Sequence, residues 1–526
     1  MIRIRQVKVP INDNTKQTMI LKIAAKLNID ISEIINYKIN KKSLDARDKK
    51  NILYIYEFDV DLVNEKKVLK KNKSKDIFKT PNEKYEYLIT GNTKMKNKPI
   101  IIGSGPAGLF CAYILAENGY NPVIIERGEK IEDRVSTVEK FFKDNILNKN
   151  SNVQFGEGGA GTFSDGKLNT LTKDKYNRGK KVFEIFVENG APKEILYENK
   201  PHIGTDLLRN VIVNIRNKII KMGGVFKYNT CLTNLIIKNQ KITAIELNNN
   251  EIVNCDNLVL AIGHSARDTF KMLLSNNITL TSKPFAVGIR IQHPQILINK
   301  AQYGSNVNLP SASYKLVYNT KDKRGVYSFC MCPGGYVVNS SSDLERLVIN
   351  GMSNYKRNSM NANSAIVVTV SEKDYGTGPL DGVKFQEKLE SISYKLGDGK
   401  IPTQLYLDYK NNKISKQFGS VKPIFKGSYH FTNINEIFPE YINNALVEGL
   451  EYFSKKIKYF NLDDAIISAV ESRTSSPIRI VRDENFMSNI YGIYPCGEGS
   501  GYSGGITTSA IDGIKIAEAI AKIYMN

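Results

Sequence analysis

The sequence predicts an α/β protein whose parallel sheet is assembled from two distant parts of the chain. Residues 99–128 contain an apolar strand, a glycine-rich turn, a helix and a second apolar strand. Residues 490–526 contain another strand, a glycine-rich turn and a closing helix. Alternation of apolar strands with helices is typical of a doubly wound α/β fold. The stretch between these parts is irregular and rich in glycine loops, so we predict an inserted α+β domain there.

The N-terminal residues predict a separate small unit. The stretch IRIRQVKVP alternates like a strand, TKQTMILKIAAKLNI has helical spacing, and residues 36–61 contain two strand-like runs around a polar turn. This order is typical of a small α+β domain of the ferredoxin-like kind, which we place at residues 1–90. Residues 66–98 are rich in Lys and Asn, and we expect them to form a linker.

Three glycines after the strand at 100–102 form a G-x-G-x-x-G motif, namely Gly103, Gly105 and Gly108. The first permits a tight turn, the second lets backbone approach a pyrophosphate, and the third lets the helix pack closely on the strand. The start of the helix offers unpaired N–H groups to phosphate oxygens. The motif therefore predicts a Rossmann-like dinucleotide site.

An acidic residue, Glu126, ends the second strand of this unit, where a carboxylate can accept hydrogen bonds from ribose hydroxyls. Residues beside the turn and the acid should also contact the nucleotide. We assign this role to Pro106, Ala107 and Arg127.

The C-terminal stretch favours FAD over NAD as the dinucleotide. A strand-like run ends at Gly497 and Glu498, and a helix begins at about Ile506 after Gly504 and Gly505. The acid can bind a ribityl chain, and the positive helix end can face the flavin pyrimidine edge. The strand 258–262, which ends at Gly263, should pass beside the cofactor.

The overall composition restricts the class of protein. The chain has 526 residues, too many for one hydrophobic core, with 41% hydrophobic and 24% charged residues. Its net charge is +21, but the lysines are spread along the chain, so we interpret them as solvated surface and expect no nucleic-acid role. Six cysteines, no apolar leader and no uninterrupted apolar span predict a cytoplasmic protein without a membrane segment.

Several stretches together resemble the bacterial FAD-dependent dehydrogenases of uncharacterised function, the NAD(FAD)-utilising dehydrogenase family of the glutathione-reductase-like flavoprotein superfamily. The stretches are SLDAR (43–47), GSGPAGLFCA (103–112), GEGGAGTFSDGKLNT (156–170), FAVGIRIQHP (285–294), MCPGG (331–335), NGMS (350–353), VESRTSSPIRI (470–480) and CGEGSGYSGGI (496–506). The resemblance implies FAD and an oxidoreductase. From the patterns along the chain, we divide it into a 1–90 N-terminal domain, a 91–283 first FAD-binding part, a 284–480 inserted substrate domain and a 481–526 C-terminal FAD-binding part.

The resemblance also gives a role to the glycine-rich segment 156–166. In such flavoproteins this segment follows the ribityl and flavin region of the cofactor. It implies cofactor contacts for Gly158, Gly159, Gly161 and Thr162, and a positive charge from Lys167 near the flavin.

A second nucleotide motif is not expected. YGTGPLDGV has the wrong glycine spacing and does not follow a strand end directly. The layout resembles fumarate-reductase-like flavoproteins, which lack an inserted NAD domain. NAD(P)H remains possible as a transient reductant.

Four residues are candidates for catalysis, and each also has a structural interpretation. His264 follows the strand end at the cofactor, and Lys167 follows the glycine-rich segment. Arg473, with Arg290 and Arg357, could clamp an anionic substrate or could form structural ion pairs. For Cys332, packing is the alternative to a thiol facing the flavin. His202 and His293 are interpreted as structural.

The function that these features favour is an FAD-dependent oxidoreductase that transfers hydride between an unidentified small-molecule substrate and flavin. Two alternatives stay open. One is an FAD-dependent enzyme that modifies RNA, which the positive charge and the basic N-terminal unit would suit. The other is a non-catalytic flavin-binding protein. No metal is expected.

Overall fold

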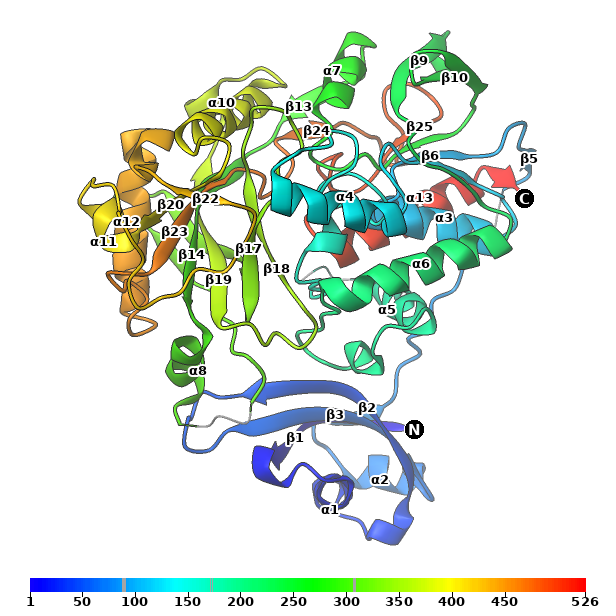
Figure 1. Ribbon diagram of the computed structural model, residues 1–526. Helices are drawn as coiled ribbons and strands as arrows, with labels where there is room; N and C mark the ends of the chain where they lie inside the picture. Colours follow the sequence, from blue (N-terminus) through cyan, green and yellow to red (C-terminus); the bar gives the residue numbers. More distant parts are fainter. Residues whose placement is uncertain (88–90, 171, 173, 306–308) are drawn as a thin grey trace.

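The computed structural model describes residues 1–87, 91–170, 172, 174–305 and 309–526. The mixed α/β fold predicted from the sequence is confirmed. Three bodies are visible in Figure 1: an N-terminal unit, a parallel α/β unit that contains the C-terminus, and a unit built on a long mixed sheet. The predicted boundary at residue 90 lies outside the described residues.

The N-terminal unit is a four-stranded antiparallel sheet with two helices on the face turned away from the rest of the molecule (Figure 1). Its spatial order β2-β3-β1-β4 is that of the predicted ferredoxin-like fold. The elements are β1 (Ile2–Pro10), α1 (Lys16–Leu27), β2 (Ile34–Asp45), β3 (Leu53–Leu62), α2 (Glu65–Lys71) and β4 (Ile77–Lys79).

The predicted linker at 66–98 was wrong for much of its length. Helix α2 buries Val68, and the three-residue strand β4 pairs with β1. Strand β5 (Thr93–Lys94) pairs with β26 (Tyr524–Met525), next to the chain's other end. The lysine-rich composition hid these elements, because α2 is only two turns long and needs a single buried residue.

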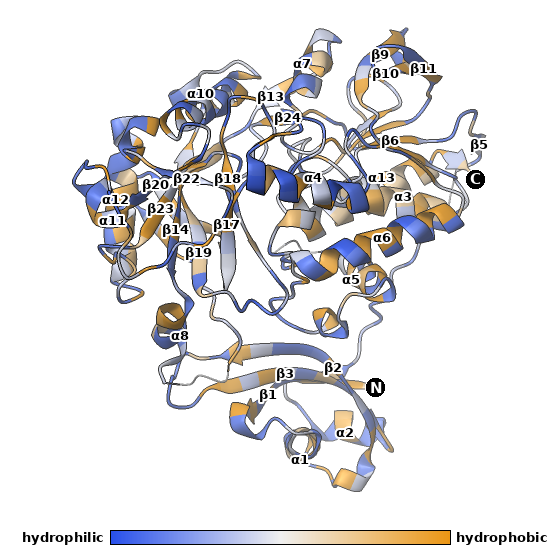
Figure 2. Ribbon diagram, viewed as in Figure 1, coloured by the Kyte–Doolittle hydropathy of each residue, from blue (hydrophilic) through white to orange (hydrophobic). Residues whose placement is uncertain are grey.

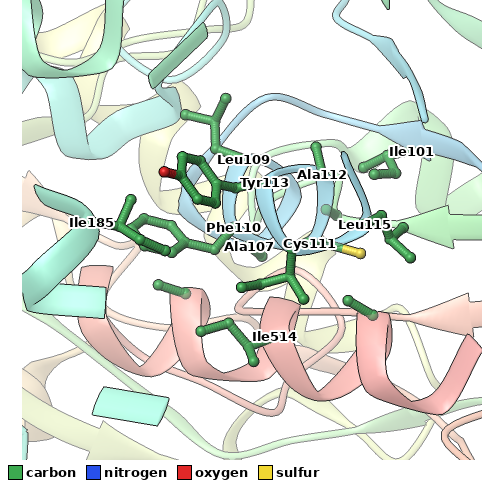
Figure 3. Packing of buried hydrophobic residues seen from close by; sticks show 14 of the residues in the cluster. Ile101, Ala107, Leu109, Phe110, Cys111, Ala112, Tyr113, Leu115, Ile185 and Ile514 are labelled. Atoms are coloured by element: carbon green, nitrogen blue, oxygen red, sulfur yellow. The ribbon is translucent and has the colours of Figure 1, made fainter. Parts of the chain in front are cut away.

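The α/β unit is built on a parallel five-stranded sheet. In spatial order its strands are β25 (Ile493–Pro495), β12 (Leu258–Leu260), β6 (Ile100–Ile102), β7 (Val123–Ile125) and β8 (Val225–Lys227). Helices α3 (Pro106–Glu117) and α13 (Ile506–Ala521) pack against each other, although they lie at opposite ends of the unit's sequence. In Figure 3, Phe110 of α3 also meets Ile185 of α5 (Arg178–Glu188), and Ile514 of α13 lies below α3.

Helix α3 is apolar on all sides, which explains its central place. Every residue from Ala107 to Ala116 is buried. Figure 2 shows this helix and α13 as largely hydrophobic, whereas α4 (Ile131–Asp144) has a hydrophilic outward side. A helix without a polar face must be covered on every side. The remaining elements of the unit are α6 (Thr205–Lys221), α7 (Arg267–Ser275) and the meander β9 (Leu232–Lys238), β10 (Lys241–Leu247) and β11 (Glu251–Asn254).

The third unit is a seven-stranded mixed sheet with helices packed on it. In spatial order its strands are β15 (Val317–Asn319), β16 (Gly325–Cys332), β19 (Asn361–Val370), β14 (Phe285–Pro294), β23 (Ile466–Glu471), β20 (Ile401–Leu405) and β22 (Tyr429–Phe431). A small sheet consists of β18 (Ile349–Ser353), β17 (Gly335–Asn339) and β21 (Phe425–Lys426). The helices are α8 (Gln295–Tyr303), α9 (Glu372–Tyr375), α10 (Asp381–Leu396), α11 (Tyr406–Lys410) and α12 (Glu440–Ser454).

The chain enters and leaves this third unit side by side. Strands β13 (Leu280–Ser282) and β24 (Ile478–Ile480) pair antiparallel beside the predicted boundaries at 283/284 and 480/481. The N-terminal unit contacts the α/β unit through the backbone of β2, where Lys42 exchanges hydrogen bonds with Tyr197 and Asn199. Among the described residues, no helix combines the length and apolar content needed to cross a membrane.

Candidate functional site

A cavity of about 780 Å³ lies where the carboxyl ends of the parallel strands face the mixed sheet. Its volume is in the range of cofactor and ligand pockets. Two kinds of wall enclose it. The nucleotide wall consists of Gly103, residues 105–107, 154–156, 159–161, 263–266 and 504–509. The insert wall consists of Phe329, Cys330, Asn350, Arg473 and Thr474.

The G-x-G-x-x-G turn separates into glycines that pack and a glycine that leaves space. A Cβ at Gly103, which has φ +98°, would lie 2.4 Å from the carbonyl oxygen of Ala261, and a Cβ at Gly108 would lie 1.9 Å from that of Gly103. A Cβ at Gly105 would meet nothing nearer than 3.9 Å, and Gly105 lines the cavity. Pro106 and Ala107 line the cavity too, whereas Gly108 does not. These are the separate tasks that the motif predicts.

Helix α3 begins at this turn, and its first two residues, Pro106 and Ala107, line the cavity. Gly105 is the N-cap, and within the described chain no side chain accepts a hydrogen bond from the first turn of α3. An uncapped helix N-terminus carries a partial positive charge and suits a phosphate oxygen.

Glu126 lines the cavity, as predicted, but its oxygens already have donors from the chain. Ser104 donates to one oxygen from its backbone N–H and from its hydroxyl, at 2.9 and 2.8 Å. The backbone N–H groups of Gly128 and Gly156 donate to the other, at 2.9 and 3.1 Å. A carboxylate has about four acceptor sites. Glu126 therefore fastens the turn to the glycine-rich segment, and its contact with a ribose stays a prediction.

Arg127 closes the same end of the cavity. Its guanidinium pairs with Asp268, donates to the sulfur of Cys231 at 3.0 Å and lies 4.5 Å from the ring centre of Phe155. Arg127, Cys231 and Thr230 all line the cavity here.

The glycine-rich segment is held by one buried arginine that sequence reasoning missed. Arg134 of α4 is fully buried, and its guanidinium donates only to backbone carbonyl oxygens. The acceptors are Asn152, Val153, Gly156, Glu157 and Gly159, at 2.6–3.1 Å. Because these carbonyls turn toward Arg134, the segment is fixed in one course along the cavity.

The predicted cofactor residues of this segment are only partly at the cavity. Gly159, at φ +63°, and Gly161 line it. Gly158 and Thr162 lie behind it: a Cβ at Gly158 would be 2.2 Å from the Thr162 hydroxyl oxygen. Their roles are therefore to shape the turn, and the prediction that they contact cofactor is not supported by their position.

The C-terminal turn supplies a second uncapped helix end. Gly504, Gly505 and Ile506 line the cavity, and no described atom lies within 4 Å of a Cβ built at either glycine. Within the described residues, no side chain caps α13. Gly497, at φ +76°, does not line the cavity, since a Cβ there would lie 2.6 Å from the Cβ of Ala107.

Glu498 and His264 lie beside each other in the cavity wall. The Oε1 atom of Glu498 is 3.8 Å from Nδ1 of His264. Burial raises the pKa of Glu498 to about 7, against the attraction of Lys283. Burial, with the positive charges of Arg473 and Arg267, lowers the pKa of His264 to about 3. His264 is therefore a neutral imidazole at neutral pH. Its Nε2 has no partner within the part of the chain that the structure describes.

Gly263 fits its predicted place beside a cofactor. It has φ +73°, lines the cavity, and no described atom lies within 4 Å of a Cβ built there. A side chain at this position would enter the cavity itself.

The geometry favours the structural interpretation of Arg473. It lines the cavity but is only 8% exposed, and its donors are all engaged. Two bonds go to Glu390, at 2.8 and 3.0 Å, and the others go to Asp343, Ser265 and Ser342. Arg267 pairs with the same Glu390 carboxylate. Arg473 could donate to a substrate anion only if one of these hydrogen bonds broke.

The other two arginines proposed as clamps are also paired. Arg290 is fully buried and forks onto Glu471 at 3.0 and 3.1 Å, and Arg357 pairs with Asp165. Lys167 does line the cavity, with its Nζ 3.4 Å from Asp165 and donating to the Met331 carbonyl oxygen. Although burial opposes it, the Asp165 charge raises the pKa of Lys167, which keeps the ammonium charged.

Of the two cysteines in this strand, the one at the cavity is Cys330 and not the predicted Cys332. Cys332 is fully buried and does not line the cavity, whereas Cys330 is partly exposed and does. Strict alternation along a strand would not separate these residues, so a local irregularity of β16 decides which sulfur faces the cavity.

The two histidines interpreted as structural have backbone partners. His202 Nε2 is 2.9 Å from the carbonyl oxygen of Tyr355, and His293 Nε2 is 2.6 Å from that of Phe460. Among the described residues, no group of three or more His, Cys, Asp or Glu could hold a metal ion.

Sequence comparisons match three segments of the chain. Residues 1–61 match a domain of unknown function, DUF8436, and residues 101–155 match an NAD(P)-binding Rossmann-like domain. Residues 284–474 match the C-terminal domain-like family of FAD-dependent proteins. An uncharacterized protein of Clostridium beijerinckii is 46% identical over 531 residues, covering 99% of each chain. The chain belongs to the family of this clostridial protein. It carries a segment that matches the C-terminal domain of FAD-dependent proteins and a segment that matches a Rossmann-like domain.

Several solved structures are similar to this chain at low identity and low TM-score. Glycine oxidase from Bacillus cereus is 11% identical, with TM-score 0.36 and coverage of 81% of this chain and 95% of that one. L-proline dehydrogenase from P. horikoshii is 12% identical, with TM-score 0.38 and coverage of 81% and 94%. Halogenase PltM in complex with phloroglucinol and FAD is 10% identical, with TM-score 0.37 and coverage of 80% and 67%. Likenesses this distant say nothing about substrate or reaction.

Proposed function

We propose that this protein is an FAD-dependent oxidoreductase that transfers hydride between a small-molecule substrate and flavin in the cavity described above. The observation that carries the proposal is that two uncapped helix N-termini, of α3 and α13, open into one continuous cavity. A dinucleotide needs positive potential at two places, at its pyrophosphate and at the electron-accepting end of its flavin.

The free space in the cavity fits this ligand. At Gly105, Gly263, Gly504 and Gly505 a Cβ would enter the cavity without meeting chain within 3.8 Å. The absence of side chains there lets backbone approach a flat or anionic group. Bound flavin would supply the capacity to accept or donate a hydride.

The chain's own residues would orient the reactants. The first turn of α13 would place backbone N–H groups at the flavin, and Lys167 would add a fixed positive charge. The insert wall would face the substrate, because Phe329, Cys330 and Asn350 come from the mixed sheet and not from the nucleotide-binding unit. His264, held neutral by burial, could accept or donate a hydrogen bond there but would not carry a charge.

The visible absorption spectrum of the purified full-length protein tests this proposal. We expect a flavin spectrum, either as purified or after FAD is added. Anaerobic NADH and NADPH are then added separately, because a transient nicotinamide reductant is part of the proposal. Bleaching by one of them would identify a nicotinamide-fed reductase, and an unchanged oxidised spectrum would indicate another electron donor. A protein that retains no FAD would overturn the proposal.

A further inference from the structure

Strand β16 contains a bulge at the cavity. In its pairing with β19, two residues of β16, Cys330 and Met331, oppose the single residue Ser364. Cys330 has φ +43°, in the left-handed region that non-glycine residues rarely adopt. Bulges re-aim side chains and are frequent beside active sites, and such backbone strain persists only where surrounding structure holds it.

Two cations and a thiol hold this bulge in place. Lys167 donates from Nζ to the carbonyl oxygen of Met331. Arg290 donates to the carbonyl oxygen of Cys330 at 3.3 Å, and the thiol of Cys332 lies 3.3 Å from the same oxygen. Residues from three different segments therefore converge on two adjacent peptide groups.

The bulge gives the two cysteines unequal positions. Cys330 lines the cavity and is partly exposed, and Cys332 lies behind it with no exposed surface. Both are free thiols, as are the other four cysteines. An accessible thiol with a buried thiol next to it is the arrangement that thiol–disulfide exchange needs, since one sulfur reacts with the external group and the other displaces it.

The charges around the pair favour a thiolate on the outer sulfur. Hydrogen bonding from Cys332 lowers the pKa of Cys330, and the charges of Lys167 and Arg290 act in the same direction, against burial. The pKa of Cys332 is raised by its neighbour and by burial. These opposite shifts favour the ionised form on Cys330 and the protonated form on Cys332. The acidic groups that face the pair are Asp165, Glu471 and Glu498.

We propose that Cys330 and Cys332 are a redox pair that exchanges two electrons with the flavin, and that Cys330 is the sulfur that meets substrate. On oxidation the Cys330 thiolate and the Cys332 thiol form one S–S bond; two electrons and the Cys332 proton pass to the flavin. On reduction, two electrons and one proton return from the flavin to the cysteines, and the S–S bond breaks. The substrate class this implies is a thiol or disulfide small enough to enter the cavity. The inference rests on the proposed function for its flavin.

Electron uptake of the FAD-loaded, fully oxidised protein tests the transfer. We expect anaerobic dithionite titration to consume four electrons per wild-type chain, two for flavin and two for the disulfide. Cys330→Ser and Cys332→Ser should each consume two. Met331→Leu, which changes the residue between the cysteines and leaves both thiols, is the matched control and should consume four. Two electrons in the wild-type chain would overturn the proposal.

A second measurement separates this proposal from the flavin assignment. The full-length protein without added FAD is oxidised with diamide, alkylated, digested and mapped by mass spectrometry. We expect a Cys330–Cys332 disulfide, and in Cys332→Ser an alkylated Cys330. If both cysteines of wild type stay alkylatable while FAD binds, the redox pair is wrong and the proposed function stands. A disulfide in a protein that cannot retain FAD would overturn electron transfer to flavin and the proposed function together.

Discussion

The nucleotide wall and the insert wall enclose one cavity but differ in the types of residue that form them. The nucleotide wall is rich in glycine, with residues such as Gly105 and Gly504, and it contains two uncapped helix ends. The insert wall is made of side chains, among them Cys330, Asn350 and Arg473. Under the proposed function, the first wall would recognise any ligand with the right phosphate and ring geometry. Chemical selectivity must come from the second wall.

The largest expected effects come from substituting two glycines of one turn in the nucleotide wall, Gly105 and Gly108. Gly105→Val should abolish FAD retention and leave the fold intact, because Gly105 has extended backbone (φ −71°, ψ −178°) and its Cβ would meet nothing nearer than the Gly159 Cα at 3.9 Å. Gly108→Ala should destabilise the fold by roughly 4 kcal/mol or more, because its Cβ would lie 1.9 Å from a carbonyl oxygen. Urea unfolding and flavin absorbance measure the two effects. Normal FAD affinity in Gly105→Val would contradict this placement of the pyrophosphate.

The next largest effect is expected behind the insert wall. Glu390→Gln should cost about 4 kcal/mol at pH 7, because it leaves Arg267 and Arg473 without their shared buried carboxylate. Burial raises the pKa of Glu390, but the charges of the two arginines outweigh it and hold the pKa below its usual value. The stabilisation is therefore complete above about pH 4.5, where the unfolded chain is ionised, and is lost as pH falls further.

Urea unfolding of wild type and Glu390→Gln at several pH values measures this. The difference in unfolding free energy should be constant from pH 7 to about pH 5 and should narrow below about pH 4.5. A difference that stays constant into acid would mean that the carboxylate contributes through its shape alone.

A third prediction concerns the nucleotide wall at Arg134. Arg134→Met should cost about 3 kcal/mol, because it leaves several buried carbonyl oxygens without donors, and it should weaken FAD binding. Arg209→Met is the matched control. Arg209 lies at the same 4.9 Å from the ring of Phe163, and its loss should cost less than about 1 kcal/mol. If Arg134→Met and Arg209→Met lose equal stability in thermal and urea unfolding, the contact with the Phe163 ring matters and the hydrogen bonds to the carbonyl oxygens do not.

The last prediction concerns Glu498, which lies in the cavity wall beside His264. Its raised pKa means that the unfolded chain loses this proton first, so this group makes stability fall as pH rises from about 4.5 to about 7. Glu498→Gln should remove that part of the pH dependence and make the apoprotein more stable than wild type at pH 8. Urea unfolding of both apoproteins between pH 5 and 8 measures this difference. If the free energy of unfolding changes with pH equally in wild type and in Glu498→Gln, the Glu498 carboxylate is exposed to water and its pKa is not raised.

The sequence predicted the nucleotide wall well and the insert wall poorly, for a physical reason. Gly103, Gly105 and Gly108 have separate tasks that follow from backbone geometry at fixed spacing, and the structure places them accordingly. The exposure of Cys330 instead of Cys332 depends on a bulge defined by pairing with β19, which lies 30 residues further on. The register between two strands that are distant in the sequence leaves no pattern in the residues of either strand. Arg134 was missed for the same reason, since its acceptors are backbone groups of any sequence.

The packing of α3 on α13 has a consequence during synthesis of the chain. Helix α3 is apolar on every side, and its partner leaves the ribosome about 390 residues later. At roughly 5–20 residues per second that delay lasts on the order of 20–80 seconds. Throughout it, the side chains of α3 that pack against α13 in the folded protein (Figure 3) lack that partner. We therefore expect this protein to need a chaperone that shields a nascent helix until translation ends.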